Sequence, residues 1–220
     1  MNILEKIFSI PKTIYFNFKV LKFRQAILLP FLVSYKTKFG SLYKNVIEFE
    51  RFKPKFFKIK LGIGGSEHVM SNRYSRISFG RNSKIIFTGN TFICDGFSIR
   101  CDNGTINIGK DFHANKNMLI NCEKNIKIGD NCTFGVNVNL RDSDGHTIVV
   151  KGIEKNNKKS ITIGNHVWIC SNVDILKGSK ISDNSVVALR SVVLKKFEDA
   201  NCLIGGYLAK VLQNNINWIK

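Results

Sequence analysis

The stretch "IGNHVWICSNVDILKGSKISDNSVVALRSVV", residues 163–193, repeats every six residues. A large aliphatic residue opens each unit, at Ile163, Ile169, Ile175, Ile181, Val187 and Val193. The fifth position is always small or β-branched, at Val167, Val173, Ser179, Ser185 and Ser191. Neither the ~3.6-residue period of a helix nor the ~2-residue period of a strand produces this spacing. A triangular solenoid does, because three short strands complete one coil and each aliphatic residue points inward.

The same period occurs earlier in the chain. One run comprises Ile108, Ala114, Ile120 and Ile126, and a second, after a slip of two residues, comprises Ile128, Phe134 and Leu140. Asn-containing pairs at 130–131, 164–165 and 183–184 mark turns, where Asn tolerates a positive φ. The sequence therefore predicts an all-β fold, a parallel β-helix over about residues 76–197, between an N-terminal extension (1–75) and a C-terminal segment (198–220).

The repeat breaks at "NLRDSDGHTI", residues 139–148. Leu140 is the last regular aliphatic position and Ile163 the next, and this spacing is not a multiple of six. The far half of the interval, "KGIEKNNKKS", is polar and rich in turn-forming residues. We expect an extruded loop over about 141–160, and insertions in solenoids commonly sit on the binding face. His146 in this loop is a candidate catalytic base.

The composition indicates a globular protein that lacks a membrane span. No uninterrupted run of ~18 apolar residues occurs, and no small-residue cleavage site follows the first apolar patch. The six cysteines form no CxxC pair, which favours small buried thiols in a cytoplasmic protein over a zinc site or a disulfide framework.

Positive charge is concentrated near the N-terminus. Residues 1–60 contain thirteen Lys and Arg against three Glu, within a chain whose net charge is +18. Aromatic residues interleave with this charge, a pattern typical of contact with the headgroup layer of an anionic membrane. We expect a peripheral contact at the inner face of the plasma membrane; a merely solvated basic cap is the alternative. No recognisable motif supports a nucleic acid as partner.

Three stretches, "IGNHVWIC", "NSVVALRSVVLKK" and "NCLIGGYLAKVL", resemble the hexapeptide-repeat (left-handed β-helix) acyltransferases, and in particular the sugar and capsular polysaccharide O-acetyltransferases. The resemblance covers roughly residues 77–216. It implies a left-handed coil, a homotrimer, and acetyl-CoA bound as co-substrate between neighbouring prisms, without a metal. The predicted fold also includes a short C-terminal helix.

The function that this resemblance implies is acetyl-CoA-dependent O-acetylation of a sugar hydroxyl, on a bacterial surface polysaccharide or its lipid-linked or nucleotide-linked precursor. Two alternatives stay open: N-acetylation of a nucleotide-linked amino sugar, and a non-catalytic β-helix scaffold. A carbonic anhydrase would need three aligned zinc-binding histidines, and His68, His113 and His166 do not supply them.

Transfer from a thioester to an alcohol requires a base, and the basicity of histidine suits that task. His146 follows a glycine, as the catalytic histidine does in the family pattern, and we expect direct attack without a covalent enzyme intermediate. Asp142 and Asp144 match the "D-x-D-x-H" of the polysaccharide branch. Either carboxylate could orient the imidazole, or it could only shape the loop.

The resemblance also assigns binding residues. Those expected along the CoA path are Trp168, Ser171, Leu189, Arg190, Leu194, Lys195, Gly206 and Lys210. For the acceptor, Asn115 in "FHANKN" and Glu123 are the candidate contacts. The chain departs from the pattern at Cys170 and Arg190, where the family carries glycine, and at "GGYL", where it carries "AG-x-P". Glycine permits close backbone approach, so these departures bear on how CoA would lie.

Overall fold

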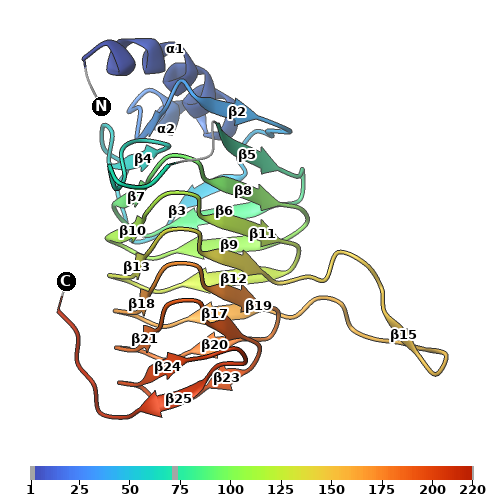
Figure 1. Cartoon of the computed structure of the whole chain (residues 1–220). Coiled ribbons are helices and arrows are strands. Elements are labelled where there is room, and N and C mark those ends of the chain that lie inside the picture. The colour runs from blue at the N-terminus through green and yellow to red at the C-terminus, as the bar shows by residue number, and fades with distance from the viewer. Residues whose placement is uncertain (1–2, 71–73, 220) are drawn as a thin grey trace.

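A computed structural model of the chain describes residues 3–70 and 74–219. In this part of the chain, three long sheets form the faces of a triangular prism (Figure 1). Sheet A contains β1 (Phe31–Val33), β4 (Ile59–Leu61), β7 (Thr91–Ile93), β10 (Phe112–Ala114), β13 (Thr133–Phe134), β18 (Trp168–Ile169), β21 (Val186–Val187), β24 (Leu203–Gly205) and β25 (Lys210–Gln213). Sheet B contains β2 (Thr37–Phe39), β5 (Ser75–Phe79), β8 (Ser98–Cys101), β11 (Leu119–Cys122), β14 (Asn139–Arg141), β19 (Asp174–Leu176) and β22 (Val192–Val193). Sheet C contains β3 (Ile47–Phe49), β6 (Lys84–Phe87), β9 (Thr105–Ile108), β12 (Asn125–Ile128), β17 (Ile161–Ile163), β20 (Lys180–Ile181) and β23 (Lys196–Phe197).

The chain visits sheets A, B and C in turn, and each coil pairs with the next through parallel strands. In sheet A, for example, His113 pairs with Thr133, and Thr133 pairs with Trp168. The predicted left-handed parallel β-helix is confirmed. We call its three edges the A–B, B–C and C–A corners, after the sheets that meet there.

The six-residue period places the side chains as predicted. The aliphatic first positions from Ile163 to Val193 are buried, each at most 1% exposed. The small fifth positions, including Ser185 and Ser191, are buried as well. Their hydroxyls hydrogen-bond the nearby backbone: Ser191 Oγ, for instance, donates to the Ala188 carbonyl at 2.7 Å. The repeat therefore encodes both the core and the tight corners.

The start of the β-helix differs from the prediction. Parallel pairing begins at Phe31, which pairs with Ile59, and not near residue 76. The spacings from Phe31 to Ile59 and from Ile59 to Thr91 are not multiples of six, because long corner segments interrupt the upper coils. The upper core is also filled by phenylalanines, including Phe31 and Phe97, in place of the aliphatic residues that reveal the lower repeat.

Helix α1 (Ile3–Val20) covers the top of the prism, and the short α2 (Phe23–Ala26) follows it (Figure 1). Phe16 and Val20 on its inner side are fully buried. Among the described residues, no helix is both long and apolar enough to span a membrane.

Three polar side chains of α1, spaced four residues apart, hydrogen-bond the outer edge of β1. Thr13 Oγ1 accepts from the Val33 amide at 3.0 Å and donates to the Val33 carbonyl at 3.2 Å. Asn17 bonds both backbone groups of Phe31, and Ser9 Oγ accepts from the Tyr35 amide. Four helical residues rise ~6 Å, close to the ~6.6–6.8 Å between alternate residues of a strand. The helix thus supplies the partners that β1 would otherwise lack.

The C-terminal segment contains a strand where a short helix was expected. β25 pairs antiparallel with β24 and covers the last edge of sheet A. Because β24 would otherwise end the coil with unpaired backbone groups, the backbone of β25 satisfies them. The tail then turns back along the prism, and Ile216 N donates to the Asn201 carbonyl at 2.9 Å.

Candidate functional site

The A–B corner carries one group of predicted site residues. Asn115, Ser171, Leu189 and Gly206 follow the ends of β10, β18, β21 and β24, which are neighbours or near neighbours in sheet A. Hydrogen bonds join successive coils at this corner: Asn115 N donates to the Phe134 carbonyl at 2.9 Å, and Ser171 Oγ accepts from Val136 N at 3.0 Å. The resulting edge exposes Leu189, which is 59% exposed, beside Arg190.

Arg190 has left-handed backbone, with φ of 57°. Corresponding turns at this corner place Asn117, Asn137 and Asn172 at similar φ, and asparagine tolerates this conformation better than a long side chain. Glycine adopts this conformation without cost, whereas Arg190 adopts it with strain. The side chain of Arg190 is exposed, so its charge projects from the corner.

The other departure from the family pattern, Cys170, lies half-buried next to Ser171. Burial raises the pKa of the Cys170 thiol above its ordinary value. The group is consequently a protonated, weakly nucleophilic side chain at neutral pH.

Trp168 projects from the outer face of sheet A and is 40% exposed. A second tryptophan, Trp218 of the C-terminal tail, lies 6.0 Å from it between ring centroids. Trp218 stacks on the His166 ring at 4.2 Å, and its Nε1–H donates to the His166 carbonyl at 2.9 Å. His166 also hydrogen-bonds Asn184 through Nδ1. The sequence reasoning missed Trp218, since the tail carries no repeat that would place it.

The B–C corner carries the second group. The segment between β14 and β17 leaves the coil there and projects from the prism as a hairpin, with β15 (Val149–Val150) antiparallel to β16 (Ile153–Glu154) (Figure 1). A bridge between Ser143 and Lys158 closes its base.

Asp142, at the start of this segment, is fully buried. Its carboxylate accepts hydrogen bonds from the backbone amides of Glu123 and Lys124, at 2.7 and 2.8 Å, and from the Cys122 thiol at 3.4 Å. No hydrogen bond joins it to His146 in the described part of the chain. Asp142 therefore holds the base of the loop to the coil above.

Asp144 forms an ion pair with Lys177, whose ammonium also donates to the Asn156 carbonyl at 2.9 Å. Lys177 thus ties both arms of the loop to the next coil. Glu123, the second candidate acceptor contact, pairs with Lys158 at 2.9 Å. The hydrogen bond that the Lys158 ammonium donates to the Glu123 carboxylate raises the pKa of Lys158. Neither lysine was singled out from the sequence, because their partners lie one coil or one loop arm away.

His146 is exposed and makes no hydrogen bond or ion pair with any other residue that the structure describes. Gly145 before it has φ of 79°, and its amide donates to Ser143 Oγ at 3.0 Å. The turn thus presents the imidazole outward, with both ring nitrogens available to a ligand or to another chain.

Leu194 and Lys195 lie at the same B–C corner, after β22, and Leu194 is 47% exposed. Lys195 Nζ lies 5.3 Å from the centroid of the Phe197 ring. Lys210 is exposed on β25, opposite Gly205.

The two groups stand at opposite edges of sheet B. Strands of three or four residues, at ~3.3 Å per residue, set the corners roughly 10–13 Å apart before the loop projects further. A single chain therefore does not bring His146 beside Asn115, Trp168 and Arg190. The two groups of predicted site residues lie on separate edges of the prism.

Asn115 has a structural task that the sequence did not reveal. Its Oδ1 accepts from the Ser66 amide at 3.1 Å and from the Lys116 amide at 2.8 Å. Lys116 Nζ donates to the Val69 carbonyl at 2.8 Å, so the two residues hold the segment before residue 70 against the corner. Among the described residues, none accepts a hydrogen bond from the Nδ2 of Asn115, which could donate to an acceptor hydroxyl.

Within residues 3–70 and 74–219, no cluster of three or more His, Cys, Asp or Glu side chains is arranged to hold a metal ion. His113 lies against the Phe92 ring, and its Nε2 is 3.8 Å from the Cys94 thiol. His68 is exposed in the segment before residue 70.

Comparison with known proteins finds sequence similarity to acetyltransferases. Galactoside O-acetyltransferase of Escherichia coli K12 is 38% identical over 111 residues, 49% of this chain and 53% of that protein. An "uncharacterized 24.8 kDa protein in cps region" of Klebsiella pneumoniae is 30% identical over 201 residues, 91% of this chain and 86% of that protein. The crystal structure of the polySia-specific acetyltransferase NeuO shares the fold, with a TM-score of 0.54 at 24% identity, covering 84% of this chain and 72% of that one.

The chain spans about half the length of the first curated relative that it matches. No family model matches the sequence.

Proposed function

The chain belongs to the hexapeptide-repeat, left-handed β-helix family of acyltransferases, and on that premise we propose that it is an acetyl-CoA-dependent O-acetyltransferase. The acceptor is a sugar hydroxyl of a bacterial surface polysaccharide or of its precursor. The observation that carries the proposal is His146: it is exposed on a loop that Asp142 and Lys177 fasten to the coil, and it has no structural partner among the described residues. Similarity to a galactoside O-acetyltransferase and to a polysialic acid O-acetyltransferase, both of Escherichia coli, supports this acceptor class.

The proposed step is direct. A ring nitrogen of His146 accepts the proton of the sugar hydroxyl while that oxygen attacks the thioester carbonyl carbon. The tetrahedral intermediate then collapses, the carbon–sulfur bond breaks, and the imidazolium returns its proton to the leaving thiolate. General-base assistance of this kind contributes ~10²–10⁴-fold in rate.

The complete site is proposed to lie between two chains of a homotrimer. The A–B corner of one chain would supply Asn115, the adjoining face of sheet A would supply Trp168, and the loop of a neighbour would supply His146. The separation of these residues across sheet B supports this arrangement, because within one chain they face different edges. Asp142 then acts by fastening the loop, and Asp144 by pairing with Lys177.

The remaining assignments follow the same two edges. Asn115 Nδ2 and the Glu123 carboxylate are proposed to contact the acceptor. The acetyl-CoA path is proposed to follow residues of sheet A, of the corners and of the last strand: Trp168, Ser171, Leu189, Arg190, Leu194, Lys195, Gly206 and Lys210. The cationic members would meet its phosphates.

We also propose that the protein works at the inner face of the plasma membrane. The outer side of α1 supports this, since Leu4 and Phe8 are each 62% exposed and Lys6 between them is exposed as well. Apolar and basic side chains together suit the headgroup layer of an anionic bilayer.

The direct test measures CoA release from acetyl-CoA in the presence of glycan acceptors. His146→Ala should lower the rate ~10²-fold or more, whereas His68→Ala, which removes another exposed histidine, should leave it unchanged. Full activity of His146→Ala would overturn the proposed base. Activity only with nucleotide-linked amino sugars would replace O-acetylation by N-acetylation.

Subunit mixing tests the site between chains. His146→Ala and Asn115→Ala are each expected to be poorly active alone. Co-expressed, they should regain activity, because some interfaces then combine a native loop with a native corner. Absence of recovery in mixed trimers, verified by differently tagged chains, would place both residues in the same chain's site.

A further inference from the structure

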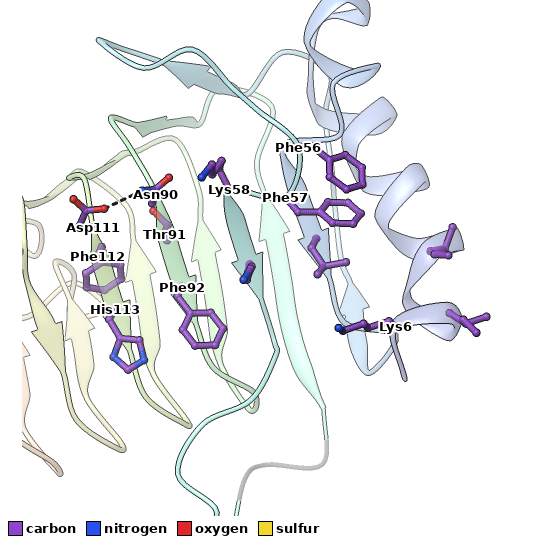
Figure 2. Close-up of a pocket in the computed structure, with 14 residues that line it drawn as sticks. Lys6, Phe56, Phe57, Lys58, Asn90, Thr91, Phe92, Asp111, Phe112 and His113 are labelled. Carbon is purple, nitrogen blue, oxygen red and sulfur yellow. Dashed lines mark hydrogen bonds between the residues drawn. The ribbon is translucent and has the colours of Figure 1, made fainter. Parts of the chain in front are cut away.

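A groove lies on the upper part of sheet A, beside α1, away from the loop that carries His146 (Figure 2). It encloses about 860 Å³, within the range typical of ligand pockets. Its apolar lining comes from α1, from the corner before β4 and from sheet A: Ile7, Ile10, Leu32, Phe56, Phe57 and Phe92. No residue assigned to the proposed acetyl transfer lines it.

The lining presents unusually large apolar groups to solvent. Phe56 is 62% exposed, Ile7 is 53% exposed and Ile10 is 47% exposed. The Phe56 and Phe57 rings stack with centroids 3.7 Å apart. Figure 2 shows this pair next to α1, with Phe92 and His113 projecting from neighbouring strands of sheet A. Exposed apolar surface of this extent in a concave site marks a place where an apolar ligand binds.

The backbone at Phe57 is strained to present these rings. Phe57 has φ of 53°, and a bulky residue in this left-handed region is an outlier. At the same C–A corner, the lower coils use residues that tolerate the conformation: Asp111, Asn131, His166, Asn184 and Asn201. Phenylalanine here lowers stability relative to Asn or Gly, and such strain commonly marks functional positions.

Basic groups surround the apolar floor. Lys6, Lys58 and Lys60 line the groove, and Lys60 Nζ lies 6.0 Å from the centroid of the Phe92 ring. The acidic lining residue, Asp111, accepts a hydrogen bond from Asn90 Nδ2 at 3.0 Å. The lining therefore combines a hydrocarbon surface with an excess of positive charge.

We propose that this groove binds an anionic amphiphile, with the hydrocarbon chain against the phenylalanines and the phosphate or carboxylate head at Lys58 and Lys60. The lysine ammonium groups are too strongly hydrated to lie within the apolar part, so the head group is bound at the rim. His113 in the wall of the groove is two residues before Asn115. A glycan carried by the bound amphiphile would thus lie over the candidate acceptor contact, a step that rests on the proposed function.

Farnesyl phosphate, farnesol and inorganic phosphate are suitable probes in calorimetry with the full chain. Farnesyl phosphate should bind, farnesol more weakly, and inorganic phosphate not detectably. Phe56→Ser should weaken farnesyl phosphate binding about tenfold or more, as expected for losing a buried aromatic contact. Phe23→Ser is the matched control. The Phe23 side chain is 66% exposed, a fraction similar to that of Phe56, but it lies outside the groove. The affinity of this variant for farnesyl phosphate should stay within about twofold of wild type.

The charge half of the proposal has its own pair of variants. Lys60→Gln should weaken the binding of farnesyl phosphate but not that of farnesol, and Lys22→Gln, outside the groove, should change neither affinity. Thermal unfolding of each variant checks that the fold is retained.

The proposal would be overturned if farnesyl phosphate did not bind. Equal losses of affinity in Phe56→Ser and Phe23→Ser would also overturn it, since they would indicate general surface adsorption. So would a concentration-dependent assembly that Phe56→Ser abolishes, which would show a second copy of the chain in the groove. CoA release with a soluble acceptor should be unaffected by Phe56→Ser. The proposed binding in the groove and the proposed acetyl transfer can therefore be refuted independently.

Discussion

The carboxylate of Asp142 is held by the backbone amides of Glu123 and Lys124, one coil above it, at 2.7 and 2.8 Å. The carboxylate is fully buried, and charge-assisted bonds of this kind contribute ~1.5–3 kcal/mol each. The contact joins the root of the loop to a coil that the chain has already completed. We therefore expect its effect on His146 to be positional.

Asp142→Ala should lower the free energy of unfolding by roughly 2–4 kcal/mol in urea titration, since it removes a fully buried acceptor from two partly buried backbone amides. Asp144→Ala, which removes an exposed ion pair, should change the free energy of unfolding by less than about 1 kcal/mol. If Asp142→Ala retained native stability yet lost activity as fully as His146→Ala, the carboxylate would have to act on the imidazole itself.

Lys177 makes a second prediction because it ties two arms of the loop, at Asp144 and at the Asn156 carbonyl. Lys177→Ala should accelerate limited proteolysis within 143–158 and reduce CoA release several-fold, with global stability changed by less than about 1 kcal/mol. Lys180→Ala removes an exposed ion pair with Glu198 on sheet C and should affect neither measurement. Equal proteolysis of the two variants would refute the tether.

The lower coils could be predicted in detail because each hexad repeats the same demand, one inward aliphatic residue and one small corner residue. The upper coils could not, since Phe31 and Phe97 fill the core there and the corner insertions hide the period. Pairings such as Asp142 with Glu123, or Lys177 with Asp144, follow from vertical stacking across an interrupted repeat. No local pattern encodes them. Likewise, nothing in the final residues announced that Trp218 would stack on His166.

Arg190→Gly is expected to stabilise the protein. A non-glycine residue in the left-handed region costs ~1–2 kcal/mol, partly offset by ~0.5–1 kcal/mol of backbone entropy that glycine loses on folding. The free energy of unfolding should therefore rise by roughly 0.5–1 kcal/mol. Asn201→Gly, at φ of 56°, should change little, because asparagine already tolerates that backbone.

Arg190→Gly also tests whether the Arg190 side chain contacts CoA. If the Arg190 guanidinium contacts a phosphate, Arg190→Gly should raise KM for acetyl-CoA while the melting temperature increases. An unchanged KM would remove Arg190 from the proposed CoA path without affecting the conformational argument.

Cys94 predicts a loss of stability at alkaline pH. Burial, with a smaller contribution from Asp95, raises the pKa of its thiol from 9.0 to about 11. The folded state therefore holds a proton that the unfolded state releases between these values, and stability must fall as pH rises through that window. At ~1.4 kcal/mol per pKa unit the loss amounts to roughly 2–3 kcal/mol.

Urea titrations of wild type and Cys94→Ala over a pH series measure this effect. The difference in unfolding free energy between the two proteins should be constant below pH 9.0 and shift by the stated amount, in favour of the variant, as pH approaches about 11. Parallel curves across the whole range would show that the thiol is not desolvated in solution.

The polar row of α1, formed by Ser9, Thr13 and Asn17, has a consequence for how the protein behaves at high concentration. An open-ended solenoid is a template: its terminal strand can recruit the matching end of another molecule, and each addition exposes a new end. Here the first strand is already bonded by a helix, and β25 occupies the last. The two caps therefore cover both ends of sheet A, and molecules cannot join end to end through β1 or β24 without displacing them.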